Sequence, residues 1–270
     1  MEISINLSTK LTNIAKKAGY AIIEINKNSD QSLIESKFDG SPLTLADQKS
    51  HEIIVGSLSK MDGNLPIISE EGSLGNFVEK SFCYLVDPLD GTKEFLRGNG
   101  MYTVNIALMK KNLSGGWKPI LGVVHAPDTG ITWSGGVGLP PTRSDNAGTK
   151  KIRAGRSSKI PIILGSVSHS SPLDLSFAES IGNHIFEGVG SSIKICRVAD
   201  GSADMAPRFG PTSCWDTAAA HAVLNAAGGN LLSPDGEEIS YDVPGRILNP
   251  WYFATSNNKW KEEWIAHQKL

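Results

Sequence analysis

Cysteine is scarce in this sequence, which has three cysteines in 270 residues, Cys83, Cys196 and Cys214. No two of them are spaced as in a C-x-x-C motif. Neither a disulfide framework nor a cysteine-rich metal site is therefore expected. Few and scattered cysteines are typical of proteins in a reducing compartment. The sequence predicts a cytoplasmic protein whose cysteines are small, buried apolar side chains.

Long apolar runs are missing as well. No stretch approaches the ~20 apolar residues that are needed to cross a bilayer. The first residues, from Met1 to Asn6, lack the basic and apolar regions of a signal peptide. We expect no integral membrane segment, and peripheral attachment at the inner face of the cell membrane stays an open alternative.

Charge of one sign is not in excess, because 28 acidic residues oppose 26 basic ones and the net charge is −2. A nucleic-acid partner, which requires a basic surface, is not expected. The six histidines show no H-x-x-x-H spacing, which disfavours zinc. The sequence also lacks G-x-x-x-x-G-K-[S/T], and no G-x-G-x-x-G follows a strand, which argues against NTPases and dinucleotide enzymes.

Hydrophobic periodicity predicts the secondary structure. The predicted helices cover 8–27, 45–60, 191–199 and 216–227. The predicted strands cover 82–86, 102–110, 119–125, 130–134 and 162–164. Short turns between the strands from 102 to 134 indicate an antiparallel meander. Helices and strands follow no regular βαβ rhythm, which favours an α+β fold built as a layered sandwich. The segment 138–150, rich in Gly, Pro and Ser, predicts a boundary between two halves, 1–150 and 151–270.

The most informative motif is D-P-L-D-G-T, which runs from Asp87 to Thr92 after an apolar strand. Pro88 interrupts the strand and the D-G pair predicts a turn, so Asp87 and Asp90 are held on one tight loop. Carboxylates that close repel each other unless they share a proton or a cation. A hard divalent ion bound through oxygen meets this need. Taken alone, however, the motif is more typical of a structural turn, and it does not fit an EF-hand.

Other acids lie where they could complete such a site. Glu70 and Glu71 follow an apolar strand, and neighbouring side chains on a strand face opposite ways, so we expect Glu70 to point inward and Glu71 outward. Asp216 stands where the N-cap of the last predicted helix belongs. Asp47 follows Thr44 as in a capping box. Capping alone explains Asp47 and Asp216. Yet Asp216 so placed could complete a metal shell with Asp87, Asp90 and Glu70. Asp47 becomes a base or an outlying metal ligand if its helix end points into the same cleft.

Candidate groups for binding an anion occur in the second half of the chain. The sequence from Gly190 through Ser191 to Ser192 opens a predicted helix with backbone N–H groups and hydroxyls. Lys194 and Arg208 are candidate cations for a phosphate. Each of these features is also common on ordinary protein surfaces, so they gain meaning only beside the acidic motifs.

Three motifs together resemble the metal-dependent, lithium-sensitive phosphatases of the inositol monophosphatase superfamily. They are E-E-G at 70–72, D-P-L-D-G-T at 87–92 and W-D-T-A-A at 215–219. Four further segments are similar to one branch, the 3'(2'),5'-bisphosphate nucleotidases of CysQ type. They are K-E-F at 93–95 and the segments 98–108, 190–194 and 207–216. Inositol phosphatases continue D-G-T with T-N-F instead. The resemblance runs from about residue 40 to residue 250. It implies an α/β/α/β/α sandwich of the inositol monophosphatase and fructose-1,6-bisphosphatase type.

The resemblance also implies roles for individual residues, around two or three Mg²⁺ ions. The implied metal ligands are Glu70, Asp87, the main-chain carbonyl of Leu89, Asp90 and Asp216. The implied catalytic residues, which activate the attacking water, are Asp47, Thr92 and Glu70. The implied substrate contacts are Gly91, Thr92, Ser168, His169, Gly190, Ser191, Ser192, Lys194, Arg208 and Asp216. Relatives often have an arginine where this chain has Val167, so a cation near the nucleotide is absent here.

The reaction implied by the resemblance is hydrolysis of adenosine 3',5'-bisphosphate to AMP and phosphate, with a role in sulfur assimilation and nucleotide recycling. An inositol monophosphatase or other sugar-phosphate phosphatase with the same metal core is the first alternative. A non-catalytic nucleotide-binding protein is the second. The expected partner is a small nucleotide, and the expected state is a monomer or a homodimer.

Overall fold

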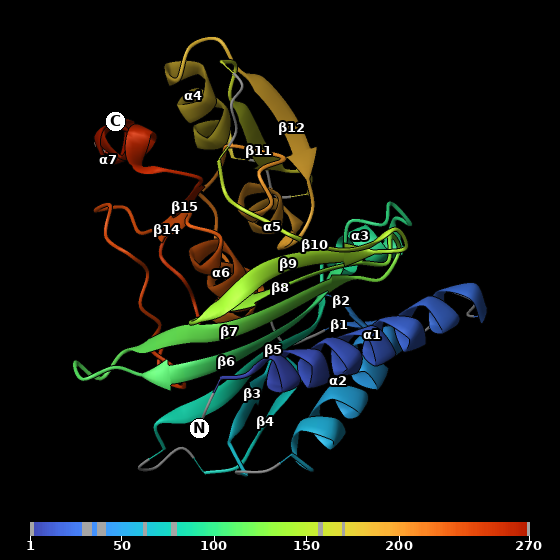
Figure 1. Cartoon of the computed structure of the whole chain (residues 1–270). Helices are drawn as coiled ribbons and strands as arrows, with labels where there is room; N and C mark the ends of the chain where they lie inside the picture. Colours follow the sequence, from blue (N-terminus) through green and yellow to red (C-terminus); the bar gives the residue numbers. More distant parts are fainter. Residues whose placement is uncertain are drawn as a thin grey trace.

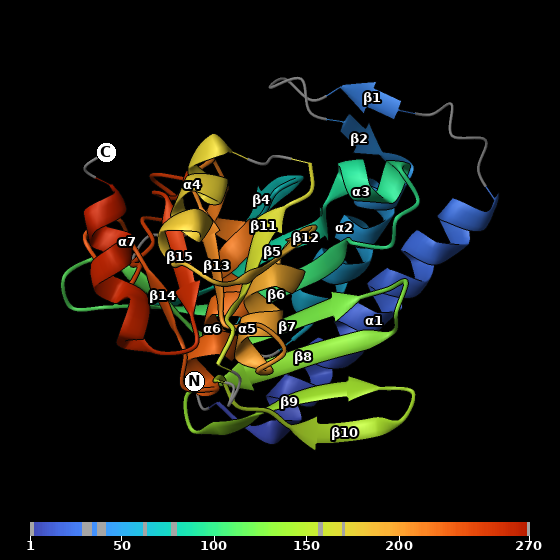
Figure 2. The same ribbon diagram turned by 90° about the horizontal axis from the view of Figure 1, so that it is seen from above.

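The computed structural model describes residues 3–28, 34–36, 42–61, 64–76, 80–155, 159–168 and 171–268. Its helices and sheets stack in five layers, in the order helix, sheet, helix, sheet, helix (Figure 1; Figure 2). This arrangement confirms the layered α+β sandwich that the resemblance implied. A small hairpin of β1 (Ile34–Ser36) and β2 (Pro42–Thr44) leads into the second helix.

The first layer consists of two helices that cover one face of the larger sheet, α1 (Ile5–Asn28) and α2 (Leu45–Leu58). On α1, Leu11, Ala15, Ala18 and Ile22 are fully buried. They recur at spacings of three and four residues, which places them on one helical face. The two predicted helices at 8–27 and 45–60 are therefore confirmed.

The second layer is an eight-stranded sheet in the order β10-β9-β8-β7-β6-β5-β3-β4. Its strands are β3 (Ile67–Ser69), β4 (Gly72–Leu74), β5 (Phe82–Asp90), β6 (Thr103–Lys111), β7 (Trp117–Ala126), β8 (Ile131–Gly136), β9 (Leu139–Asp145) and β10 (Gly148–Lys151). All neighbours are antiparallel except β3 and β5, which are parallel. The predicted meander is thus confirmed.

The segment 138–150 differs from its predicted loop character. It forms β9 and β10, which extend the large sheet at one edge (Figure 2). Main-chain pairing of β9 with β8 on one side and with β10 on the other satisfies its backbone, so polar side chains such as Arg143 and Ser144 are tolerated there. Composition alone indicated a loop because it does not register this pairing. The division into two halves at this position stays a prediction.

The third layer lies between the sheets and contains α5 (Ile193–Ala199) and α6 (Cys214–Ala226) (Figure 1). The alanines of α6 let it approach the large sheet closely. Gly122 of β7 is required there, because a Cβ at this position would stand 2.0 Å from the Ala219 carbonyl oxygen. α6 begins two residues earlier than predicted, and α5 begins two residues later, which moves both N-terminal caps.

The fourth layer is a five-stranded sheet in the order β12-β11-β13-β15-β14. Its strands are β11 (Ile162–Ser166), β12 (Ile185–Val189), β13 (Met205–Arg208), β14 (Asn230–Leu232) and β15 (Tyr252–Thr255). The fifth layer contains α4 (Pro172–Ser180) and α7 (Lys261–His267), after the short helix η1 (Asn258–Trp260). Phe177, Phe253 and Trp264 pack between these last two layers. Of these elements, the sequence predicted only β11. None of the helices in the described ranges is both long and apolar enough to cross a membrane.

Candidate metal centre and substrate pocket

A β-bulge in β5 places the two aspartates of the D-P-L-D-G-T motif on one face. The strand continues to Asp90 instead of ending before Asp87 as predicted. Asp87 aligns with Asn105 and Asp90 aligns with Thr103, so three steps along β5 match two along β6. One extra residue of this kind is a β-bulge, and Pro88, which has no N–H for the ladder, lies within it. Because residues two apart on β6 share a face, Asp87 and Asp90 point to the same side.

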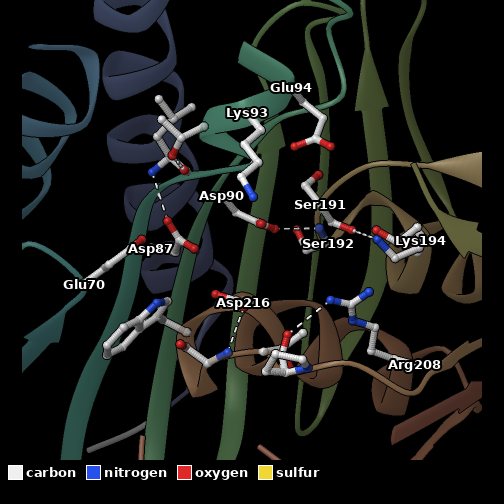
Figure 3. A pocket seen from close by; sticks show the side chains of 18 of the residues that line it. Glu70, Asp87, Asp90, Lys93, Glu94, Ser191, Ser192, Lys194, Arg208 and Asp216 are labelled. Carbon is white, nitrogen blue, oxygen red and sulfur yellow. Dashed lines mark hydrogen bonds between the residues drawn. The ribbon is translucent and has the colours of Figure 1, made fainter. Parts of the chain in front are cut away.

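Asp216 reaches the same place from the first turn of α6 (Figure 3). It is not the N-cap, as the sequence indicated; Ser213 is, and Asp216 is the third helical residue. The backbone N–H of Ser213 donates to Asp216 Oδ2 over 2.8 Å, which is one half of a capping box. The box holds the carboxylate at a fixed height above the helix N-terminus.

The three aspartates form one cluster. Asp87, Asp90 and Asp216 each offer a carboxylate oxygen, and these oxygens lie within 4.8 Å of one another. Glu70 lies in the turn between β3 and β4 and lines the same pocket, and its charge acts on both Asp87 and Asp216. Glu71 does not line the pocket. The sequence argument that one of these two neighbouring glutamates faces inward thus agrees with the position of Glu70.

Burial raises the pKa of all three aspartates. For Asp216, loss of hydration and then the charge of Asp90 raise the pKa to about 8. For Asp90, loss of hydration raises it to about 6, against the opposing effects of Lys194 and the Ser192 N–H. The pKa of Asp87 is well above its usual range because the group is buried and lies beside Glu70 and Asp90. The cluster therefore holds protons at neutral pH unless a cation compensates its charge.

A hard divalent cation fits this set of ligands. Among the described residues, the cluster contains only carboxylates, with no imidazole or thiolate. Leu89 lines the same pocket, and its carbonyl oxygen accepts a hydrogen bond from the Thr92 hydroxyl over 3.3 Å. Oxygen ligands of this kind are those that Mg²⁺ and Ca²⁺ prefer. A bound cation would also remove the mutual repulsion that raises the three pKa values.

Polar residues of the neighbouring strand hold Asp90 in place. Asp90 Oδ2 accepts from the Ser192 N–H over 2.6 Å, and from Thr103 Oγ1 and Asn105 Nδ2 over 3.3 Å each. The Ser192 hydroxyl in turn contacts Thr103 and Asn105 over 2.8 Å each. Sequence reasoning did not identify Thr103 or Asn105. The only available signal was two polar residues inside an otherwise apolar strand.

The sequence predicted that Ser192 would offer a free backbone N–H and a free hydroxyl at the start of a helix. The structure differs. Ser192 is the N-cap of α5, and both its N–H and its hydroxyl are used to hold Asp90 and β6. Ser191 precedes it with a φ of 49°, a left-handed conformation that is unusual for a residue with a side chain. Ser191 lines the pocket, and a contact of either serine with substrate stays a prediction.

Thr92 and Asp47 form a pair behind the carboxylate cluster. Thr92 opens the short helix α3 (Thr92–Leu96) after Gly91, whose φ of +93° suits glycine. The Thr92 hydroxyl donates to Asp47 Oδ1 over 3.2 Å. The other oxygen, Asp47 Oδ2, accepts from the Thr44 N–H over 2.8 Å, as the predicted capping box requires. Asp47 is thus fully buried and oriented from both sides.

These groups surround a pocket of about 290 Å³. Its lining includes these residues from the sequence analysis: Glu70, Asp87, Leu89, Asp90, Gly91, Thr92, Ser191, Ser192, Lys194, Arg208 and Asp216. Ser168 does not line it and instead accepts a hydrogen bond from Arg97. Gly190 packs against Met101, where a Cβ would stand 2.6 Å from the Met101 carbonyl oxygen. His169 lies outside the described residues. The substrate roles of Ser168, Gly190 and His169 stay predictions.

Two buried cations line the pocket opposite Glu70 (Figure 3). Lys194 Nζ donates to the carbonyl oxygens of Val189 and Ser191 over 3.2 and 2.9 Å. Burial lowers the pKa of Lys194 to about 8, although Asp90 opposes this effect. Arg208 donates to the Pro211 carbonyl over 3.1 Å. Both side chains therefore present positive charge at fixed positions, as an anionic ligand requires.

Several lining residues were not assigned to the site from the sequence. They are Lys93, Glu94, Ser166, Pro211, Thr212, Ser213, Trp215 and Tyr252. Lys93, Glu94 and the group from 211 to 215 lie inside the branch-specific motifs, so their motif membership was the available signal. Ser166 and Tyr252 lie on strands of the small sheet, and only tertiary packing brings them to the pocket.

The chain matches the sequence profile of the Inositol monophosphatase family over residues 6–269. It is 38% identical over 245 residues to the 3'(2'),5'-bisphosphate nucleotidase CysQ of Shigella flexneri, which covers 90% of this chain and 97% of the relative. The CysQ protein of Escherichia coli (strain K12) shows the same identity and coverage.

Solved structures agree with this match. The crystal structure of CysQ from Bacteroides thetaiotaomicron, a bacterial member of the inositol monophosphatase family, is similar with a TM-score of 0.81 and 32% identity over 93% of this chain and 98% of that chain. The Thermotoga maritima IMPase has a TM-score of 0.78 at 20% identity, with 98% of each chain covered. At that identity the likeness shows the fold alone.

Proposed function

The chain belongs to the inositol monophosphatase family, and from that premise we propose that it is a metal-dependent 3'(2'),5'-bisphosphate nucleotidase. It hydrolyses the 3'-phosphate of adenosine 3',5'-bisphosphate to give AMP and phosphate, as a step of nucleotide recycling in sulfur assimilation. The observation that carries this function is the cluster of Asp87, Asp90 and Asp216 in a pocket that also presents the buried cations Lys194 and Arg208. The pocket thus combines a metal-binding face with an anion-binding face.

The cofactor we propose is Mg²⁺, as two or three ions. The residues that would hold it are Glu70, Asp87, Asp90, Asp216 and the Leu89 carbonyl. When bound, the cations supply positive charge that makes water a better nucleophile and neutralises the phosphoryl oxygens. The protein contributes ligands that are fixed before binding, since the bulge in β5 and the capping box of α6 orient the three aspartates.

Thr92 and Asp47 are the proposed path for the proton of the attacking water. The single hydroxyl proton of Thr92 can lie toward Asp47 Oδ1 or toward the Leu89 carbonyl. When the Leu89 carbonyl is engaged by a cation, Asp47 is the acceptor that remains. Thr92 Oγ1 then presents a lone pair to the water, and Asp47 Oδ1 receives the Thr92 proton as the water loses its own.

The buried cations hold the anionic ends of the substrate. Lys194 and Arg208 are fixed by main-chain carbonyls, so little side-chain freedom is lost when a phosphate binds. Gly91 lines the pocket at the N-terminal end of α3, where the phosphate is proposed to bind. The phosphate therefore meets positive charge on one side and the metal ligands on the other.

Thr92→Val should lower kcat for adenosine 3',5'-bisphosphate by about 100-fold, because valine keeps the shape but cannot pass a proton to Asp47. Thr92→Ser keeps the hydroxyl and should retain most of the activity. Steady-state phosphate release at saturating Mg²⁺ measures both variants. Equal activity of the valine and serine variants would show that the Thr92 hydroxyl takes no part in the reaction.

The substrate class is tested by phosphate release from adenosine 3',5'-bisphosphate, inositol 1-phosphate and fructose 1,6-bisphosphate at equal concentration. We expect kcat/KM for the nucleotide to exceed that for inositol 1-phosphate by at least about tenfold, since inositol 1-phosphate lacks a second phosphate and one missing charged hydrogen bond has that effect. Fructose 1,6-bisphosphate has a second phosphate but no adenosine, and we expect its kcat/KM to be lower than that of the nucleotide as well. EDTA should abolish release, and Li⁺ should inhibit it. A preference for either sugar phosphate would replace the nucleotidase function with a sugar-phosphatase function. Absence of release from all three would favour a binding protein.

A further inference from the structure

Glu94 is a carboxylate of the pocket that the mechanism above does not use. It lies on α3, two residues after the end of the D-P-L-D-G-T motif, and it is 4% exposed. It lines the pocket, and Figure 3 shows its carboxylate directed toward Ser191. Within the part of the chain that the structure describes, no hydrogen bond or ion pair of its side chain is present. Its carboxylate oxygens therefore stay available to a hydrogen-bond donor that enters the pocket.

The neighbours of Glu94 hold it in this position. A Cβ on Gly190 would stand 2.8 Å from Glu94 Cγ, and a Cβ on Gly91 would stand 3.3 Å from Glu94 Oε2. Two glycines therefore make room for the side chain, one beside its Cγ and one beside its Oε2. Lys194 interacts with Glu94 electrostatically, but its ammonium group donates to two main-chain carbonyls instead. The carboxylate is thus fixed beside the pocket rather than neutralised by a direct contact.

The chemistry of a carboxylate limits what can lie against it. Phosphoryl oxygens are negative and would be repelled, so the group that contacts Glu94 must be a hydrogen-bond donor. The aspartate cluster that would bind cations does not include Glu94. A neutral hydroxyl or amine of the substrate can donate a hydrogen bond to the Glu94 carboxylate without bringing another charge into the pocket. Adenosine 3',5'-bisphosphate offers two such donors, the ribose 2'-hydroxyl and the adenine amine.

Position decides between the two donors. Glu94 Oε2 stands next to Gly91, at the start of the helix that also carries Thr92, so it lies beside the place proposed for the reacting phosphate. The ribose 2'-hydroxyl is on the ring carbon adjacent to the one that carries the 3'-phosphate, whereas the adenine amine is at the far end of the nucleotide. We infer that Glu94 determines specificity by accepting a hydrogen bond from the hydroxyl adjacent to the scissile phosphate, the ribose 2'-hydroxyl. This inference rests on the proposed nucleotidase function.

The test compares adenosine 3',5'-bisphosphate with its 2'-deoxy analogue. Wild-type protein should prefer the ribonucleotide by about 10- to 100-fold in kcat/KM, the size of one hydrogen bond to a charged group. Glu94→Ala should reduce the preference to near unity, because the ribonucleotide loses at least about tenfold more activity than the deoxy analogue. Glu94→Gln keeps the side-chain volume and should show an intermediate preference. Glu262→Gln, an exposed glutamate on α7, is the control and should keep the wild-type ratio.

The outcomes separate this inference from the function on which it rests. If wild-type protein releases phosphate from neither nucleotide, the nucleotidase function fails. If wild-type protein hydrolyses both equally well, or if the Glu94 variants lose activity equally on both, the hydroxyl contact is excluded. Activity of Glu94→Gln that returns with higher Mg²⁺ would instead make Glu94 a metal ligand and overturn the inference. Should Glu94→Ala fail to fold, Glu94→Gln carries the same comparison.

Discussion

Asp90→Asn should reduce Mg²⁺-dependent phosphate release from adenosine 3',5'-bisphosphate by about 1,000-fold, because a metal contributes several kcal/mol and each ~1.4 kcal/mol is tenfold in rate. Asparagine has nearly the same shape, so its side-chain oxygen can still accept from the Ser192 N–H. The change removes the negative charge and leaves the scaffold. Steady-state assays across a range of Mg²⁺ concentrations measure the loss.

Two further measurements make this prediction specific. Asp235→Asn, in an exposed turn, is the control and should leave activity unchanged. Circular dichroism should show that Asp90→Asn is folded, while the rise in melting temperature on addition of Mg²⁺ should be smaller than in wild-type protein. Near-normal turnover in a folded Asp90→Asn variant would remove Asp90 from the metal site.

The metal-free protein should lose stability as the pH rises from 6.5 to 8, by about 1 kcal/mol per pH unit. Burial raises the pKa of Asp216 to about 8, far above the unfolded value near 3.8. Between these two values the folded state binds more protons than the unfolded state, so stability is higher at low pH and falls as pH rises through the folded pKa. The slope stays below the value for one full proton because Asp216, with a pKa of about 8, is already partly deprotonated in the folded state at the upper end of this range.

Mg²⁺ should abolish this slope, since the cation and not a proton then compensates the carboxylates. Urea unfolding at several pH values, with EDTA or with Mg²⁺, measures the effect. Asp216→Asn is the matched variant, and in EDTA its free energy of unfolding should depend less on pH than that of wild-type protein. The predicted pH range ends at 8 because the pKa of Lys194 is lowered to about 8. Above that pH the unfolded state holds the Lys194 proton more tightly than the folded state, so stability rises with pH. Identical slopes with and without Mg²⁺ would contradict a cation site at these carboxylates.

The release of protons is an independent readout of the same linkage. At pH 7 a carboxyl group whose pKa is about 8 is mostly protonated. Mg²⁺ binding should therefore displace about one proton from Asp216, and Asp87, whose pKa is also raised, adds to the number released. Calorimetry in two buffers of different ionisation enthalpy measures that number directly, and Asp216→Asn should lower it.

The fold was predictable where local signals are strong. The spacing of Leu11, Ala15, Ala18 and Ile22 indicates one buried helical face, and the structure confirms it. The apolar, β-branched segments of the meander were equally clear. Short elements of the small sheet were missed because strands such as β13, with a proline and an arginine, have no distinct pattern of their own. Their strand conformation depends on neighbours that are distant in sequence.

The residues of the candidate site also fall into those that local motifs identify and those that they do not. Asp87, Asp90 and Asp216 were identified because each belongs to a motif that can be read locally. Thr103 and Asn105 were not identified, since their role is to hold Asp90 from the neighbouring strand. A polar residue on a buried strand acquires such a role only through cross-strand pairing.

By itself, the sequence of this protein determined the acidic motifs, a capping box at Thr44 and Asp47, and the resemblance to one phosphatase family from which the residues proposed for the chemistry follow. Only the tertiary structure decided how they act together. Side chains alternate along a strand, so the bulge of β5 was needed to bring Asp87 and Asp90 to one face. Ser213, not Asp216, caps α6, and the burial of Glu94 beside two glycines appears only in the packed pocket. Burial and close approach depend on residues that are distant in the chain and packed together in the fold, so they cannot be derived from a local stretch of sequence.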